Sequence, residues 1–255
     1  MRALNDGTTL PDIGFGTYPL RGDEGTAAVL DALAIGYRLI DTAVNYRNED
    51  AVGRAIAQTD VPRSDIVVTT KLPGRDHGYD ETLRSFERSA AALGLDVIDL
   101  YLIHWPNPSI GKYVDAYRAM VRLREEGRVR TVGVSNFTQE HLARVADATG
   151  VMPAVNQVEM HPFFPQVELR AFHAAHGIVT EAWSPLGKAA PVKKAAPVVA
   201  AARAHGVTPA QVVLRWHLQL GSVPIPKSAD PGRRRENLDV FGFELTDDEV
   251  AAITA

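Results

Sequence analysis

The sequence has no cysteine, no long apolar run and no apolar signal core near its first residue. The absence of cysteine excludes disulfides, thiolate metal sites and a cysteine nucleophile. No apolar run is long enough to cross a bilayer, and the polar segment from Met1 to Asp6 does not resemble a secretory signal. These absences predict a cytoplasmic protein without a membrane partner.

Positive charge is not in excess either. The chain carries 27 lysines and arginines against 31 aspartates and glutamates, and its formal net charge is -4. A nucleic-acid partner is therefore not expected, because phosphate binding needs a basic face. A chain of 255 residues that is 45% hydrophobic can bury a substantial core. No linker or break in composition divides residues 1–255, so we predict one domain.

Short apolar runs alternate with segments whose apolar residues recur at helical spacing. Strands are predicted near residues 13–16, 38–40, 66–70, 97–103, 129–134, 154–158, 178–182 and 222–225. Each is followed by at least one predicted helix, for example over residues 49–58 and 79–93. Near-continuous apolar strands between helices indicate a parallel sheet covered on both faces. Eight such units in about 250 residues predict a (β/α)8 TIM barrel, with an open doubly wound sheet as the alternative.

Polar side chains recur at the carboxyl ends of the predicted strands. In a barrel these positions converge on one rim, where barrel enzymes place their chemistry, whereas an open sheet spreads them along a line. The repetition therefore favours the barrel and predicts an active site on the rim. The series is Asp41, Lys71, His104, Ser135–Asn136, Gln157, Trp183–Ser184 and Lys227.

Asp41, Tyr46, Lys71 and His104 can together move or steer a proton. A tyrosine ordinarily titrates near 10, and we expect the Lys71 ammonium to lower the pKa of Tyr46 while Asp41 holds that ammonium in place. His104 can orient a carbonyl oxygen by a hydrogen bond. The set suits carbonyl reduction, with Tyr46 as the proton donor. A lyase that uses Lys71 as a Schiff base is the alternative, disfavoured because Asp41 keeps the lysine protonated.

No side chain can supply hydride, so a bound cofactor must. The usual dinucleotide-binding fingerprint is absent from the sequence. Gly14–Phe15–Gly16 is not followed by the third glycine that opens a helix. Another site is predicted after the last strand, where Asp230 caps a helix that starts at Pro231. A solvated basic helix is the alternative there. The groups that can enclose a phosphate are the amides of this helix start with Lys227, Ser228 and Arg233.

Two other segments bear on ligands. Residues 186–197 form a long connection, which is either a lid over a ligand bound at the rim or a solvated connector. His173 and His176 lie three residues apart on a predicted helix without a third ligand nearby. No metal site is therefore expected.

These motifs resemble the aldo-keto reductase family over nearly the whole chain. Within that family the chain is most similar to bacterial 2,5-diketo-D-gluconate-reductase-like members, because the connection after His104 is short and Trp183 replaces the more frequent tyrosine. The matching segments are Gly14–Thr17, Asp41–Ala43, Asn45–Tyr46, Asn48–Glu49, Thr70–Leu72, Leu102–Pro106, Gly133–Phe137, Asn156–Glu159, Trp183–Gly187 and Ile225–Ser228.

The resemblance implies an NADPH-dependent reductase of small aldehydes, α-keto compounds or keto sugars, expected to be a monomer. It makes Tyr46 the general acid, tuned by Lys71 and Asp41, and lets His104 orient the carbonyl. The implied cofactor contacts are Thr17, Ser135, Asn136, Gln157, Trp183, Ser184, Leu186, Lys227, Ser228, Arg233, Glu236 and Asn237, and the implied substrate contacts are Tyr18 and Trp105.

Several of these contacts carry a more specific expectation. The resemblance implies that Ser135, Asn136 and Gln157 bind the nicotinamide carboxamide and that Trp183 stacks on the ring, with packing in the core as the alternative for Trp183. It implies that Trp105 lines the substrate pocket, with packing as the alternative. It also implies that Lys227, Ser228 and Arg233 hold the 2′-phosphate and that Glu236 and Asn237 face the adenine. A nucleotide-binding redox sensor with little turnover is the alternative function.

Overall fold

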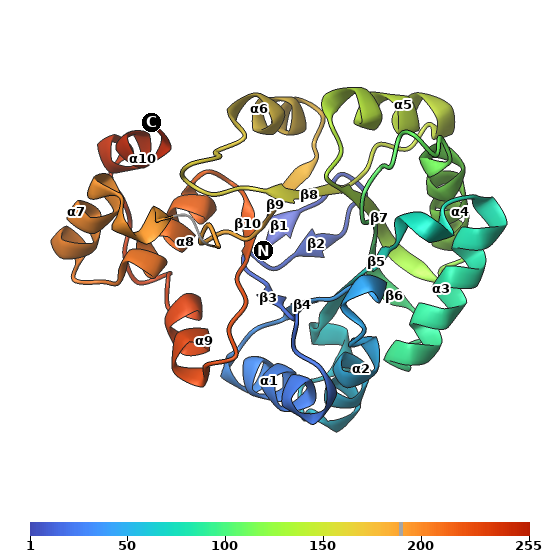
Figure 1. The fold of residues 1–255 in the computed structure, drawn as a ribbon, viewed down its shortest axis with the longest axis horizontal. Helices are drawn as coiled ribbons and strands as arrows, with labels where there is room; N and C mark the ends of the chain where they lie inside the picture. The colour runs from blue at the N-terminus through green and yellow to red at the C-terminus, as the bar shows by residue number, and fades with distance from the viewer. Residues whose placement is uncertain (189–190) are drawn as a thin grey trace.

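A computed structural model of the protein describes residues 1–188 and 191–255. Its centre is an eight-stranded parallel sheet in the order β10-β9-β8-β7-β6-β5-β4-β3, ringed by helices (Figure 1). Neighbours in the sheet are also neighbours along the chain, as in a β/α barrel. The strands are β3 (Phe15–Gly16), β4 (Leu39–Asp41), β5 (Val67–Leu72), β6 (Ile98–Ile103), β7 (Val129–Ser135), β8 (Val155–Glu159), β9 (Val179–Trp183) and β10 (Val223–Ile225).

Backbone hydrogen bonds between the segments of β3 and β10 close the sheet. The amides of Gly14 and Gly16 donate to the carbonyls of Pro224 and Pro226, each at 3.0 Å. A Cβ at Gly14 would lie 2.7 Å from a side-chain carbon of Ile225, so this close approach requires glycine. The predicted (β/α)8 barrel is confirmed.

The helices follow the strands as the periodicity predicts. The glycine caps Gly36, Gly94 and Gly150 end α1, α3 and α5 in the left-handed conformation. Asp230 caps α9 by accepting a 2.8 Å hydrogen bond from the Arg233 amide. The helices are α1 (Gly22–Ile35), α2 (Glu49–Gln58), α3 (Tyr79–Leu93), α4 (Tyr113–Glu125), α5 (Gln139–Thr149), α6 (Val167–Ala175), α7 (Ala196–His205), α8 (Pro209–Gln219), α9 (Pro231–Leu238) and α10 (Asp247–Thr254), with short 3-10 turns η1 (Val44–Tyr46), η2 (Arg63–Asp65), η3 (Gly74–Asp76) and η4 (Val192–Lys194).

The sequence prediction missed the hairpin of β1 (Arg2–Ala3) and β2 (Thr9–Leu10) and did not separate α10 from α9. Strands of two residues are too short to show a period. Leu4 and Leu10 pack against strand side chains of the barrel interior, and the hairpin lies at the barrel centre in Figure 1. It fills one end of the barrel with apolar side chains.

The apolar core has an outer layer between the barrel and its helices and an inner layer inside the barrel. The outer layer consists of a larger cluster, which includes Phe86, Tyr101 and Phe137, and a smaller one, which includes Val212 and Trp216 of α8. The inner layer lies where Leu39 and other strand residues meet the hairpin. Within residues 1–188 and 191–255, no helix has the length and apolar character needed to cross a bilayer.

Candidate active site

One cavity of about 620 Å³ lies at the carboxyl ends of the barrel strands. Side chains that the sequence spreads over more than 200 residues meet there, as expected for the rim of a barrel. Lys71 lies beneath the cavity wall and is fully buried. The predicted site residues that line the cavity are Thr17, Tyr18, Asp41, Tyr46, His104, Trp105, Ser135, Asn136, Gln157, Trp183, Ser184, Leu186 and Lys227.

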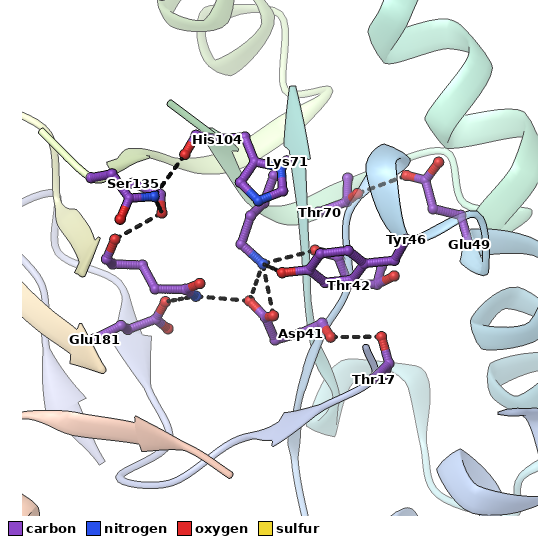
Figure 2. A network of polar contacts seen from close by, with 12 residues as sticks. Thr17, Asp41, Thr42, Tyr46, Glu49, Thr70, Lys71, His104, Ser135 and Glu181 are labelled. Atoms are coloured by element: carbon purple, nitrogen blue, oxygen red, sulfur yellow. Dashed lines mark hydrogen bonds and ion pairs between the residues drawn. The ribbon is translucent and has the colours of Figure 1, made fainter. Parts of the chain in front are cut away.

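A buried ion pair forms the floor of the site. Nζ of Lys71 lies 2.7 Å from both carboxylate oxygens of Asp41 and 3.0 Å from the carbonyl of Thr42. Burial acts to lower the pKa of Lys71, but the nearby Asp41 carboxylate and the other acidic groups outweigh it, so the pKa is raised. Lys71 therefore stays an ammonium ion at neutral pH. The predicted pairing of Asp41 with Lys71 is present (Figure 2).

Tyr46 ends the short turn η1, which follows β4 and turns the phenol back over the ion pair. Nζ of Lys71 donates a long hydrogen bond of 3.5 Å to the Tyr46 hydroxyl. Because Lys71 can only donate, the phenolic hydrogen remains free to point into the cavity. Among the described residues, no other hydrogen bond reaches this hydroxyl.

The prediction that Lys71 lowers the pKa of Tyr46 below its ordinary value is wrong for the net effect. Burial raises the pKa of Tyr46, and this outweighs the lowering by Lys71, while Asp41 raises it further. Tyr46 is consequently a protonated phenol throughout the neutral range. The Lys71 ammonium does lower the pKa of Tyr46, as expected, but burial of the phenolate raises this pKa by more.

His104 follows β6 directly, and its ring meets the Tyr46 ring edge-on with centroids 5.7 Å apart. Burial, assisted by the Lys71 charge, lowers the pKa of His104 to about 3. The imidazole is therefore neutral at neutral pH and holds a single N–H. Its Nδ1 is buried and has no hydrogen-bond partner among the residues that the structure describes. A neutral ring at the cavity wall can orient an oxygen by one hydrogen bond.

Ser135 ends β7 and is paired in register with Gln157 of β8, and Asn136 follows β7 directly. Nδ2 of Asn136 donates to the His104 carbonyl and to Oγ of Ser135, each at 3.0 Å, while Oδ1 accepts from Nε1 of Trp183 at 2.8 Å. Oγ of Ser135 donates to the Gln157 carbonyl at 2.7 Å. The side chain of Asn136 is thus held from three sides. Its backbone adopts the left-handed conformation, with φ 62°, a conformation that asparagine tolerates better than most residues.

Aromatic side chains form much of the remaining wall. Trp183 is half-buried, and Nζ of Lys188 lies 4.8 Å from the centroid of its ring, within cation–π range. Trp105 is 48% exposed and Tyr18 is 57% exposed, and both line the cavity. Trp105 therefore lies at the pocket and not in the core.

The segment after β10 places the predicted phosphate contacts at one end of the site. Lys227 lines the cavity and is exposed. Oγ of Ser228 accepts a hydrogen bond of 3.1 Å from the Asp230 amide, and Arg233 is exposed on the first turn of α9. Sequence reasoning missed Arg234, which is buried, lies 2.7 Å from Asp31 and holds the carbonyls of residues 228 and 229.

Glu236 and Asn237, predicted to face an adenine, lie on α9 outside the main cavity. Oε1 of Glu236 accepts a 2.6 Å hydrogen bond from Thr208, and Asn237 is buried. Their contact with a nucleotide stays a prediction. So does the lid formed by residues 186–197, because residues 189–190 lie outside the described residues; Leu186 and Lys188 line the cavity.

His173 and His176, for which no metal is expected, both have hydrogen-bond partners within the protein. His173 is buried and within hydrogen-bond distance of Asn156 and Thr180, at 3.0 and 2.8 Å, while His176 meets the Phe172 carbonyl at 2.8 Å. In residues 1–188 and 191–255, no group of three or more His, Cys, Asp and Glu side chains is placed to hold a metal ion.

Two further buried polar residues support the site: Asn48, which sequence reasoning matched to the family but gave no role, and Glu181, which it missed. Nδ2 of Asn48 donates to Thr17 and to the carbonyl of Leu20, which fastens the loop after β3 to the loop after β4. Glu181, on β9, accepts a hydrogen bond from Gln157. A charged residue inside the apolar run 178–182 was the available signal for Glu181.

The comparisons with known proteins agree with this geometry. Residues 12–255 match the family model described as "Aldo/keto reductase family". The chain is 58% identical to 2,5-diketo-D-gluconic acid reductase B of Corynebacterium sp. over 99% of this chain and 91% of that protein.

Solved structures are similar over the same extent. A crystal structure of a Gox0644 mutant in complex with NADPH superposes with a TM-score of 0.95 at 49% identity and covers 99% of this chain and 92% of that one. A Bombyx mori aldo-keto reductase in complex with NADP gives 0.92 at 35% identity, with coverage of 99% and 91%.

Proposed function

The chain belongs to the aldo/keto reductase family, and we propose that it reduces an aldehyde or ketone with NADPH, with Tyr46 as the proton donor. The observation that carries this proposal is the chain of contacts from Asp41 through Lys71 to the Tyr46 hydroxyl, which ends at the cavity. The complexes of two similar proteins with NADPH and NADP support the choice of cofactor.

Bound NADPH supplies the hydride that reaches the carbonyl carbon. As negative charge develops on the carbonyl oxygen, the free phenolic hydrogen of Tyr46 moves to it. The resulting phenolate lies within reach of the Lys71 ammonium, 3.5 Å away. A pair of unit charges at about 4 Å attracts by about 4 kcal/mol at an effective dielectric constant near 20. Lys71 thus favours the form of Tyr46 that has given up its proton.

His104 has a different role in the proposal. Since its pKa lies near 3, it does not compete with Tyr46 as an acid at neutral pH. Its ring stands beside the Tyr46 ring and lines the cavity, so its N–H can hold the carbonyl oxygen next to the phenol. Holding the reacting groups in the correct geometry lowers the barrier in addition to the proton transfer.

The residues of the cavity fit a nicotinamide nucleotide. Gln157 presents an amide to the cavity, Trp183 presents an aromatic ring to stack on, and Lys227 presents a cation at the other end. Lys227, Ser228 and Arg233 would distinguish NADPH from NADH by contact with the 2′-phosphate, because charge-assisted hydrogen bonds to phosphate are stronger than neutral ones.

We propose small aldehydes, α-keto compounds and keto sugars as the substrate class. Tyr18 and Trp105 stand half-exposed at the mouth of the cavity, where aromatic faces can cover the apolar side of a small polar substrate. The relative at 58% identity is a 2,5-diketo-D-gluconic acid reductase. A single-domain monomer is part of the proposal, and sedimentation of the purified chain checks it.

The test is turnover of a panel with NADPH, followed by cofactor absorbance. We expect oxidation of NADPH with methylglyoxal and with 2,5-diketo-D-gluconate, and slower oxidation with NADH. Absence of turnover across aldehydes, diketones and keto sugars would contradict the proposal. Tight NADPH binding without turnover would instead favour the redox sensor.

A further inference from the structure

Glu181 is a fully buried acid inside the barrel. It lies in the middle of β9, paired in register with Gln157 of β8, so both side chains point to the same side of the sheet. Oε2 accepts a hydrogen bond of 2.8 Å from Nε2 of Gln157. Oε1 is buried and has no hydrogen-bond partner among the described residues. Glu181 does not line the cavity, and the proposed proton transfer does not use it.

The amide nitrogen of Gln157 joins Glu181 to the ion pair. Nε2 donates to Oδ2 of Asp41 and to Oε2 of Glu181, both at 2.8 Å, and Figure 2 shows Glu181 and Asp41 connected through this amide. A primary amide has two hydrogens, so each acid takes one. The two acceptors together select this orientation of the amide, because the flipped amide would turn its oxygen toward the oxygens of Asp41 and Glu181.

The other end of the amide is the free end. No hydrogen bond to Oε1 of Gln157 occurs among the residues that the structure describes, and Gln157 lines the cavity. Both hydrogens of the Asn136 amide are already donated to His104 and Ser135, and its oxygen already accepts from Trp183. Gln157 therefore offers a free acceptor to an N–H group in the cavity. The Asn136 amide does not, because its oxygen is already paired with Trp183.

We propose that Glu181 is a positioning residue that takes the second amide hydrogen of Gln157 and thereby holds the Gln157 oxygen toward the carboxamide N–H of the bound nicotinamide. This inference rests on the proposed function, because it needs a nicotinamide in the cavity. The carboxamide fixes the rotation of the ring, so the orientation of Gln157 bears on how well the cofactor is held for hydride transfer.

The protonation of Glu181 agrees with this role. Burial, with the Asp41 charge next, raises the pKa of Glu181 to about 8. At neutral pH it is mostly an uncharged acid, which accepts from Gln157 without placing a second negative charge beside the pair of Asp41 and Lys71. Glutamine at position 181 keeps an acceptor of the same shape, whereas methionine keeps the length of the side chain and removes both oxygens.

The experiment compares the binding of two ligands to the wild type, Glu181→Met and Glu181→Gln. NADPH reaches the nicotinamide end, whereas 2′,5′-ADP carries only the adenosine and phosphate end. For Glu181→Met we expect NADPH binding to weaken about tenfold, equivalent to about 1.4 kcal/mol. We expect 2′,5′-ADP binding to change less than about twofold, and Glu181→Gln to bind NADPH within about threefold of the wild type.

Thermal unfolding separates positioning from a structural role. Glu181→Met removes a buried acid whose second oxygen has no partner, which is stabilising, but it also leaves one Gln157 amide hydrogen without its acceptor, so we expect its midpoint to lie close to that of the wild type. Unchanged NADPH binding in a folded Glu181→Met would overturn the inference, and so would equal losses for both ligands. If Glu181→Met does not fold, NADPH binding by Glu181→Gln decides: a tenfold loss there overturns it. Failure of the wild type to bind NADPH would instead refute the proposed function.

Discussion

The two ends of the site hold their charges in opposite ways. Around Tyr46, the Lys71 ammonium and the Asp41 carboxylate are buried and share short hydrogen bonds. After β10, Lys227 and Arg233 are exposed. A charge in a buried site interacts strongly with its neighbours, whereas exposed charges are weakened by water and salt.

This difference suits the chemistry that each end is proposed to perform. Proton transfer needs a phenol and an ammonium held in fixed positions. The barrel strands and the turn after β4 hold Lys71 and Tyr46 in such positions, 3.5 Å apart. Binding a phosphate requires only that cations be available, and a moderate affinity lets the used cofactor leave. We therefore expect changes at the buried end to have large effects and changes at the exposed end to have small ones.

The largest effect is expected for Tyr46→Phe. Without the phenolic hydrogen, kcat should fall about 10³-fold, within the range for general acid catalysis, while the dissociation constant for NADPH changes less than about twofold. Steady-state kinetics and fluorescence titration measure the two quantities. The matched control is Tyr18→Phe, whose ring lies 5.1 Å from that of Tyr46 and which should keep kcat within about threefold. An equal loss in both variants would remove the role given to Tyr46.

Lys71→Met should be the most destabilising of these changes. It leaves the Asp41 carboxylate buried without its cation, which costs about 3–5 kcal/mol in the free energy of unfolding. Urea denaturation followed by circular dichroism measures it. Adding Asp41→Leu should recover part of the loss, because the unpaired charge is then gone. Lys188→Met, at an exposed lysine of the same cavity, is the control. A similar loss for Lys188→Met would contradict the comparison.

The buried acid Glu181 should make the free energy of unfolding depend on pH. Its pKa is raised from 4.5 to about 8 in the folded state, mainly by burial. Between these values the folded chain keeps a proton that the unfolded chain releases, so this group makes the protein less stable as pH rises from about 4.5 to 8. Relative to Glu181→Gln, the wild type should lose a few kcal/mol over this range and no more above it. Parallel curves for the two proteins would contradict the burial of an ionisable Glu181.

Arg233→Ala should have the smallest effect. We expect NADPH to bind about tenfold more weakly at low salt, with NADH unaffected and the difference shrinking as salt rises, because the charge is exposed. Titration at two ionic strengths tests this. Arg235→Ala on the same helix is the control, since Arg235 is directed to Asp31, 3.5 Å away. A loss for NADH equal to that for NADPH would show that Arg233 does not recognise the 2′-phosphate.

Much of the fold was predictable because its signals are local. The apolar periods placed α2 at Glu49–Gln58 and α3 at Tyr79–Leu93 as the structure has them. The cap at Asp230 depends on residues three positions apart. The polar strand ends predicted that Asp41, Lys71 and His104 would meet, since parallel strands of one barrel end on one rim. The hairpin of β1 and β2 was missed because two-residue strands carry no period.

The sequence by itself determined the barrel, the rim and the residue types that reach it, because periods, caps and strand ends are properties of neighbouring residues. Tertiary structure alone decided the sign of the Tyr46 pKa shift, which depends on how deeply the phenol is buried against one ammonium 3.5 Å away. It also decided the meeting of Gln157 with Asp41, 116 residues away, and with Glu181. Burial and distance arise only when the strands close, so no stretch of sequence contains them.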